Sequence, residues 1–132
     1  GASGMAALKL IELGGDALEG MVLTQSFLAD AADPSGKVKD FVTKFKEKYK
    51  EDPIPHGAQA YDTVYIIADA LKRGGSTQPQ ALRDAISKTS GLKLVTGSPK
   101  FNAKGDDIGK RLLITAINKG RFVLVEGVMA GQ

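Results

Sequence analysis

The sequence of 132 residues contains no cysteine and a single histidine, His56. The absence of cysteine excludes disulfide frameworks, zinc–cysteine sites and thiol nucleophiles, and it is compatible with an oxidising or a reducing compartment. One histidine makes a multi-histidine metal site or a Ser-His-Asp triad hard to build. We therefore expect no enzymatic activity, no metal site and no cofactor.

Long hydrophobic runs are also lacking. The longest apolar stretches, around 64–71 and 112–117, are short or interrupted, whereas a membrane-spanning helix needs roughly 18 to 20 consecutive apolar residues. The opening Gly-Ala-Ser-Gly lacks the charged start and the apolar core of a secretory signal. The sequence predicts no membrane-spanning helix, and either no signal targets the chain or the signal lies upstream of Gly1.

The composition is that of an ordinary single globular domain with one core, since 42% of the residues are hydrophobic and 25% are charged. The net charge of +3 is mildly basic. Lysines cluster in segment 37–50, but Asp40 and Glu47 lie among them and no aromatic residues interleave on the same face to stack bases. The cluster therefore indicates a solvated helix face and no nucleic-acid partner.

The first segments of the chain indicate a short helix and a strand. Ser3 can cap a helix that Gly14-Gly15 ends. The apolar residues of this helix recur at helical spacing at Met5, Leu8 and either Ile11 or Leu13. Segment 20–25, GMVLTQ, is apolar and β-branched, which is typical of a buried strand. We interpret 26–33 as a loop.

Two amphipathic helices follow this loop. Asp33 suits the N-cap of the first helix and Pro34 suits its first helical position. The Asp-Pro-Ile-Pro sequence at 52–55 breaks this helix, because proline cannot donate a backbone hydrogen bond and restricts the residue before it. The second helix begins near His56, and Gly74-Gly75 ends it.

A third amphipathic helix is predicted from Thr77 and Gln80, which match the spacing of a capping box, and Gly91 marks its end. Each of the three helices has one apolar stripe that is suited to burial. The stripes are Val38, Phe41, Val42, Phe45 and Tyr49; Ala60, Tyr61, Val64, Tyr65, Ala68 and Leu71; and Ala81, Leu82, Ala85 and Ile86.

The C-terminal part of the chain is rich in β-forming residues. We expect a short strand at 92–95 and a turn at 101–106. The runs 111–117 and 121–126 have strand character, and 118–120, Asn-Lys-Gly, is a hairpin-length connection with a glycine available for positive φ. The sequence therefore predicts a C-terminal β-hairpin.

Segment 105–111, GDDIGKR, is no phosphate loop. It is one residue short between its glycines, lacks a Ser or Thr after the lysine and leads into a strand pattern instead of a helix. Asp106 and Asp107 have neither the spacing nor the closing Glu of a calcium-binding EF-hand loop. We interpret both as turn-forming residues.

Four segments, in this order, carry a resemblance to a known family. They are GGDALEGMV at 14–22, GAQAYDTVYIIADALKRGG at 57–75, ALRDAI at 81–86 and VTGSPKFNAKGD at 95–106. Together they resemble the C-terminal part of the branched-chain amino-acid-binding family of type I periplasmic binding proteins.

The resemblance implies a partial α/β fold from a protein of two lobes joined by three crossovers. Residues 1–26 would end the second lobe, 27–97 would form the helical segment of the first lobe, and 98–132 would hold a crossover and the C-terminal hairpin of the second lobe. The implied function is that of the solute-binding component of an ABC importer, which captures an amino acid of the branched-chain type or a related small carboxylate and delivers it to a membrane permease. The implied location is periplasmic or extracellular, with or without a lipid anchor.

The resemblance also implies positions for the site. Ligand contacts are expected at His56, Gly1 and Gln25. Hinges are expected at Ser26, Phe27, Gly97 and Phe101. His56 falls where the family often has an aromatic side chain beside the ligand, at a helix start that favours an anion. A histidine there suits a polar or aromatic ligand better than a purely aliphatic one; the alternative is a capping or surface histidine.

The three helical stripes would normally pack on a parallel sheet that this chain does not itself encode. We therefore expect that the chain is part of a longer product or that it self-associates through these faces. Two alternatives to a solute-binding protein are a self-associating module that does not bind ligand and part of a sensory ectodomain of the same fold. Complete coverage of the stripes within a single chain would contradict the resemblance.

Overall fold

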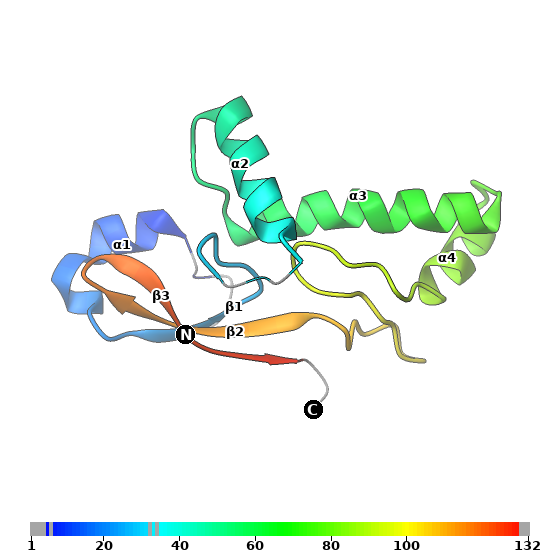
Figure 1. The fold of residues 1–132 in the computed structure, drawn as a ribbon. Coiled ribbons are helices and arrows are strands. Elements are labelled where there is room, and N and C mark those ends of the chain that lie inside the picture. The colour runs from blue at the N-terminus through cyan, green and yellow to red at the C-terminus, as the bar shows by residue number, and fades with distance from the viewer. Residues whose placement is uncertain (1–4, 6, 32, 34, 130–132) are drawn as a thin grey trace.

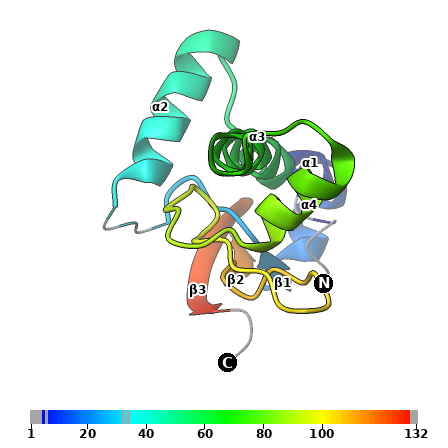
Figure 2. The same cartoon turned by 90° about the vertical axis from the view of Figure 1, so that its right-hand side faces the viewer.

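The computed structural model describes residues 5, 7–31, 33 and 35–129, and Figure 1 shows their arrangement. In chain order the elements are α1 (Leu8–Gly14), the 3-10 helix η2 (Gly15–Leu18), β1 (Val22–Gln25), α2 (Lys37–Tyr49), α3 (Pro55–Gly74), α4 (Pro79–Ser87), β2 (Arg111–Asn118) and β3 (Arg121–Met129). The segment between α4 and β2 runs beneath α3 (Figure 1). Figure 2, which looks along α3, shows α2 on one side of it, α4 on the other and the strands below.

The three strands form one antiparallel sheet in the order β1-β2-β3. The predicted hairpin is confirmed: Asn118 pairs with Arg121, and Lys119 and Gly120 between them both have positive φ, at 50° and 68°. Two positive φ angles in a two-residue loop give the turn that matches the twist of a hairpin. The carboxylate of Glu19 accepts the Lys119 backbone N–H at 3.0 Å, which fastens the turn to the end of η2.

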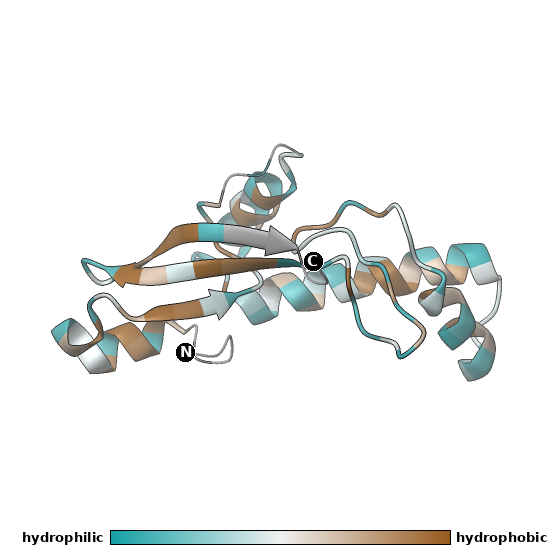
Figure 3. Cartoon of the chain, turned by 90° about the horizontal axis from the view of Figure 1, so that it is seen from below, coloured by the Kyte–Doolittle hydropathy of each residue, from teal (hydrophilic) through white to brown (hydrophobic). Residues whose placement is uncertain are grey.

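One face of the sheet is buried against the N-terminal helices. The alternating pattern of β2 places Leu113, Thr115 and Ile117 on this face, and Leu23 of β1 lies beside them. Ile11, Leu18, Met21 and Phe122 pack around Leu23 and Ile117. Figure 3 shows the hydrophobic stretches of the three strands side by side. Burial of each large apolar side chain contributes about 1.5 to 3 kcal/mol, so this face anchors the sheet to α1.

A second core joins α2 to α3. The buried residues of this core are Phe27, Val38, Phe41, Ala58 and Val95, with Ala29, Val42 and Phe45 packed around them. Phe27 and Phe41 meet edge to face with their ring centroids 5.7 Å apart. The apolar stripe predicted for α2 is therefore largely covered within the chain.

The apolar stripe of α3 lies on the opposite side of its helix from the residues that this chain buries. Ala58, Asp62 and Ala70 are buried, whereas Tyr61, Val64 and Tyr65 are 36%, 65% and 48% exposed. The described part of the chain therefore leaves most of this stripe exposed, although the Tyr61 ring packs on Phe41 with the ring centroids 4.9 Å apart. This exposure agrees with the expectation that something outside the chain covers it.

The starts of two helices differ from the sequence prediction. α2 begins at Lys37, after Gly36 in the left-handed region, and the carboxylate of Asp33 caps it from further out by accepting the Val38 N–H at 2.9 Å. The prediction of a capping box for the third helix is wrong. Gln78 is the N-cap residue of this helix, which begins at Pro79 and has no side-chain cap hydrogen bond. Proline has a fixed φ that suits the first helical position, so the helix starts one residue later than the box requires.

The end of α4 and the strand at 92–95 also differ. α4 ends at Ser87, ahead of Gly91. Residues 92–95 form no strand; Leu94 makes only an isolated bridge to Gly97. The turn at 101–106 is present, and the Asn102 side-chain oxygen accepts the backbone N–H groups of Lys104 and Asp106. Ser3 and Pro34, the other two residues of the predicted helix starts, lie outside the described residues.

Candidate ligand-binding site

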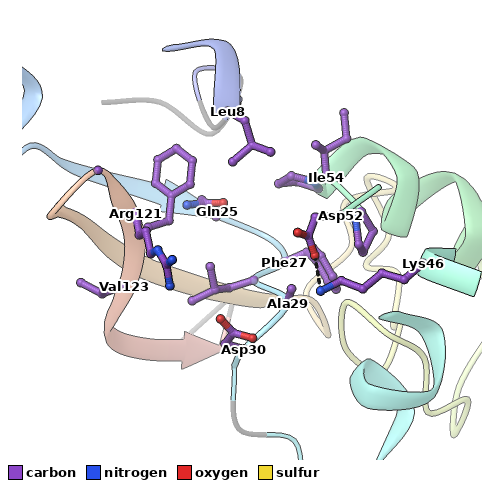
Figure 4. A pocket seen from close by; sticks show the side chains of 15 residues that line it. Leu8, Gln25, Phe27, Ala29, Asp30, Lys46, Asp52, Ile54, Arg121 and Val123 are labelled. Carbon is purple, nitrogen blue, oxygen red and sulfur yellow. Dashed lines mark ion pairs between the residues drawn. The ribbon is translucent and has the colours of Figure 1, made fainter. Parts of the chain in front are cut away.

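A cavity of about 690 Å³ lies between the sheet and the connection from α2 to α3 (Figure 4). Four parts of the chain line it: Leu8 at the start of α1, Gln25 at the end of β1 with Phe27 to Asp30 after it, Lys46 with Asp52 to Pro55, and Gly120 to Val123 around the start of β3. The volume is in the range of small-molecule sites, which are usually lined by apolar groups with a few polar ones. The apolar side chains in these walls include Leu8, Phe27, Ile54 and Phe122.

Gln25 is a buried polar group in the cavity wall. It ends β1 and is only 2% exposed. Its Nε2 donates to Thr115 Oγ1 of β2 at 2.8 Å, and Thr115 Oγ1 donates to the carbonyl oxygen of Leu23 at 3.2 Å. The antiparallel register sets Leu23 opposite Thr115, which brings these three groups together.

Charges of both signs surround the mouth of the cavity. Lys46 and Asp52 form an ion pair at 2.6 Å (Figure 4). The hydrogen bond and the charge of Asp52 raise the pKa of Lys46 above its usual 10.5. Asp30 and Arg121 are exposed as well, and the charge of Asp30 adds to the rise in the pKa of Lys46. The rim can therefore face a ligand that carries an amine and a carboxylate.

The predicted ligand residues differ in where they lie relative to the cavity. Gln25 lines the cavity, whereas His56 is exposed and does not. His56 is the second residue of α3, directly after Pro55, which does line the cavity. Gly1 lies outside the described residues.

The predicted hinge residues lie in two segments that both contact α3. Ser26 Oγ accepts a hydrogen bond from Gln59 Nε2 at 2.7 Å, and the neighbouring Phe27 is in the core beside α2. Gly97 and Phe101 line a smaller hollow of about 300 Å³ beneath α3. Both segments thus leave the helical part of the chain next to α3.

Sequence reasoning missed Asp62 and Thr115, which hold these two regions in place. Asp62 accepts the backbone N–H groups of Val95 and Thr96 at 3.0 and 2.7 Å. Asp62 lies on the polar side of the predicted stripe, so hydropathy gave no reason to expect its burial. Two small residues on the same side of the helix, Ala58 and Ala70, were the available signal of close packing.

A model of the family described as "Periplasmic binding protein" matches residues 1–121, which is most of the chain. This chain belongs to the periplasmic binding protein family. The family consists of solute-binding proteins and not of enzymes. The match confirms the family resemblance that the four sequence segments carry, and with it the non-enzymatic class.

Known periplasmic binding proteins match at moderate identity. The leucine-, isoleucine-, valine-, threonine- and alanine-binding protein of Pseudomonas aeruginosa is 28% identical over 106 residues, which cover 80% of this chain and 27% of that protein. A leucine-binding protein of Thermotoga maritima has a TM-score of 0.84 and 30% identity, covering 96% of this chain and 36% of the other. A substrate-binding protein of an ABC transporter from Desulfitobacterium hafniense, solved with Leu, has a TM-score of 0.76 and 25% identity, covering 93% and 40%.

These comparisons confirm the partial α/β fold of a type I periplasmic binding protein. The chain spans about a quarter of the length of the curated relatives it matches. No helix among the described residues is long and apolar enough to cross a membrane. In the same residues, no group of three or more His, Cys, Asp and Glu side chains is placed to hold a metal ion.

Proposed function

We propose that this protein captures an amino acid, of the branched-chain type or a related small carboxylate, as the solute-binding component of an ABC importer. The observation that best supports this function is the position of the cavity. Its walls come from residues 8, 25 and 120–123, which we assign to the second lobe, and from residues 27–30, 46 and 52–55, which we assign to the first. A ligand there would touch both lobes.

Contact with both lobes is what a closing mechanism requires. A ligand shifts an open-to-closed equilibrium only when it binds the closed form better, and contacts from both lobes supply that difference. We propose Ser26, Phe27, Gly97 and Phe101 as the residues about which the lobes turn. Closure would also bring His56, next to Pro55 in the cavity wall, into contact with the ligand.

The names of the relatives support the ligand class. The Pseudomonas aeruginosa relative is named for binding leucine, isoleucine, valine, threonine and alanine, and the Desulfitobacterium hafniense structure contains Leu. The apolar walls of the cavity suit a small side chain, and the charges at its mouth suit an amine and a carboxylate. L-Leucine is therefore the first probe, and polar and aromatic amino acids follow because of His56.

Titration calorimetry of the full-length gene product that contains this chain tests the proposal. We expect saturable 1:1 heat with at least one of the twenty L-amino acids, and an increase in melting temperature with the same amino acid, since a ligand that binds only the folded state stabilises it. Absence of both signals for all twenty, and for the matching carboxylates without an amine such as 4-methylpentanoate, would contradict the function.

The exposed stripe of α3 supports the proposal that other protein covers this helix. The curated relatives are much longer than this chain, so we propose that further polypeptide of the same protein forms a parallel sheet over Tyr61, Val64 and Tyr65. The second candidate is a module that self-associates through this stripe and binds no amino acid, or part of a sensory ectodomain. Intact mass with size-exclusion chromatography distinguishes a longer polypeptide from a self-associating module. A module made of this chain alone would have the mass of this chain and would elute as an oligomer.

The name of the family implies a periplasmic location. We propose that the full-length protein works in the periplasm or outside the cell and passes its ligand to a membrane permease. A lipid anchor on the full-length protein is an additional part of this proposal. Fractionation with and without detergent tests it: a soluble protein is released with the periplasmic contents, and an anchored protein needs detergent.

A further inference from the structure

The amide of Gln25 has a fixed orientation. A threonine hydroxyl has one proton, and that of Thr115 goes to the carbonyl oxygen of Leu23, which accepts but cannot donate. Thr115 Oγ1 therefore accepts its second hydrogen bond from Gln25, and the group that faces it is the amide nitrogen. In the structure the amide nitrogen faces Thr115 Oγ1, and the amide oxygen faces away from it.

The fixed nitrogen turns the amide oxygen away from the sheet. Among the described residues no group donates to Gln25 Oε1, and Gln25 lines the cavity. Figure 4 shows the oxygen on the side of the cavity that faces Ile54. Leu8, Phe27 and Phe122 line the same cavity, and none of these side chains offers a donor. A hydrogen-bond acceptor thus stands in an apolar part of the cavity.

We infer that Gln25 is a specificity-determining residue whose Oε1 accepts a hydrogen bond from an N–H group of the bound ligand, with Thr115 as its positioning residue. This inference rests on the proposed function and names one contact of that site. The amine is the N–H donor that all primary amino acids share. A ligand without it would cover the Gln25 oxygen and leave it unpaired, and an unpaired buried polar group strongly disfavours binding.

The charged groups at the mouth do not select the ligand in the same way. Asp30 and Arg121 are exposed, and the side chains of Lys46 and Asp52 are about half exposed. Water satisfies and screens such groups when no ligand is bound. Gln25 is shielded from bulk water, so the presence or absence of one ligand donor changes its pairing completely.

The test measures the affinity of the full-length gene product for L-leucine and for 4-methylpentanoate, which has the same carbon skeleton and no amine. We expect Gln25→Leu to weaken L-leucine binding by about 10-fold or more. Its binding of 4-methylpentanoate should change much less, so the ratio of the two affinities falls. Gln80→Leu on the exposed face of α4 makes the same chemical change away from the cavity and should alter neither affinity.

Variants of Thr115 test the positioning role without removing Gln25. Thr115→Val removes the acceptor that holds the amide nitrogen, so the amide can turn; we expect a several-fold weaker binding of L-leucine. Thr115→Ser keeps the hydroxyl, so its affinity for L-leucine should be close to that of the wild type. In the Gln25→Leu background, Thr115→Val should cause no further loss, because the two residues act through one contact. If Gln25→Leu does not fold, the contrast between Thr115→Val and Thr115→Ser decides.

The inference would be overturned if Gln25→Leu bound L-leucine as tightly as the wild type does. It would also be overturned if the ratio of the affinities for L-leucine and 4-methylpentanoate were the same in both proteins. Either result would leave the proposed function intact. Equal affinities of Thr115→Val and Thr115→Ser would overturn the positioning role. A wild-type protein that binds a carboxylate such as 4-methylpentanoate but none of the twenty amino acids would overturn this inference alone. A wild-type protein that binds neither class would overturn the proposed function, and this inference with it.

Discussion

Asp62 and Thr96 are joined by two hydrogen bonds of 2.7 Å, one from the Thr96 backbone N–H and one from its hydroxyl, both accepted by Asp62 Oδ2. The other carboxylate oxygen accepts the Val95 N–H at 3.0 Å. Asp62 is 3% exposed, so three donors replace the water that a buried carboxylate loses. A residue in the middle of α3 therefore fixes the segment that leads to the proposed hinge at Gly97.

Removal of this carboxylate should cost a large part of the stability of the protein. Asp62→Asn keeps the shape but places an amide nitrogen opposite N–H donors, and we expect a loss of about 2 to 4 kcal/mol, because hydrogen bonds to a charged group are worth about 1.5 to 3 kcal/mol each. Urea unfolding of the full-length product measures it. Asp69→Asn on the same helix breaks a more exposed pair with Arg73 and is the control, with a loss below about 1 kcal/mol. Equal losses would show that Asp62 is not a structural anchor.

The same hydrogen bonds explain why the strand expected at 92–95 is absent. Local sequence favours an extended segment there, but a strand needs its N–H groups for a neighbouring strand, and those of Val95 and Thr96 are taken by Asp62. The partner lies more than thirty residues earlier on a helix, so no local pattern reveals it. The hairpin of β2 and β3, by contrast, depends on a two-residue turn and adjacent β-forming runs, and sequence reasoning predicted it correctly.

Gly97 should tolerate no side chain. Its φ is 137°, and a Cβ there would lie 2.9 Å from the backbone nitrogen of Arg111 and from the carbonyl oxygen of Gly109. We expect Gly97→Ala to destabilise the protein by about 1 to 3 kcal/mol, from backbone strain together with this contact. Gly91→Ala is the matched control: Gly91 also has positive φ, at 77°, but open space around its Cβ position. Thermal unfolding that shows equal losses for both variants would exclude the contact as the cause.

The cap of α2 should make stability depend on pH. Burial raises the pKa of Asp33, but the hydrogen bonds from Val38 and Ser35 outweigh it, and the pKa lies below its usual value of 3.8. A carboxyl with a lowered folded-state pKa contributes stability that is present above its unfolded pKa and is lost as pH falls through the folded value. We expect Asp33→Ala to cost about 1 kcal/mol at pH 7 and progressively less below pH 3.8.

Urea unfolding at several pH values checks this dependence. Asp33→Asn keeps an acceptor for the Val38 N–H without a titrating group, so its stability relative to Asp33→Ala should not change through the same range. A cost of Asp33→Ala that stays constant below pH 3.8 would contradict the assignment.

The candidate site was only partly accessible from the sequence. The family resemblance predicts ligand contacts at His56 and Gln25; Gln25 lines the cavity, and His56 follows Pro55 of its wall. The partner of Gln25, Thr115, is ninety residues further along the chain, and only the pairing of β1 with β2 brings it close. The role of the Gln25 amide oxygen follows from that pairing, so it could be inferred only once the register of the sheet was known.

His56 should contribute to binding and not to folding. It is exposed at the second position of α3, so His56→Ala removes little packing. We expect affinity for the bound amino acid to fall by at least several fold in the full-length product, while the melting temperature of the ligand-free protein stays the same. Affinity equal to that of the wild type would show that His56 is a surface residue.

The exposed stripe of α3 provides the most direct test of what surrounds this chain in the intact protein. Val64 is 65% exposed, and an aspartate at such a surface position would change stability by no more than about 0.5 kcal/mol. If further polypeptide covers the stripe, Val64→Asp buries a charge against an apolar layer and destabilises the full-length product far more. We expect a loss of several kcal/mol in urea unfolding, whereas Thr43→Asp on the exposed side of α2 should have almost no effect. If Val64→Asp is as stable as Thr43→Asp, and the protein is monomeric with either substitution, then nothing covers α3 and the proposed packing on a parallel sheet is wrong.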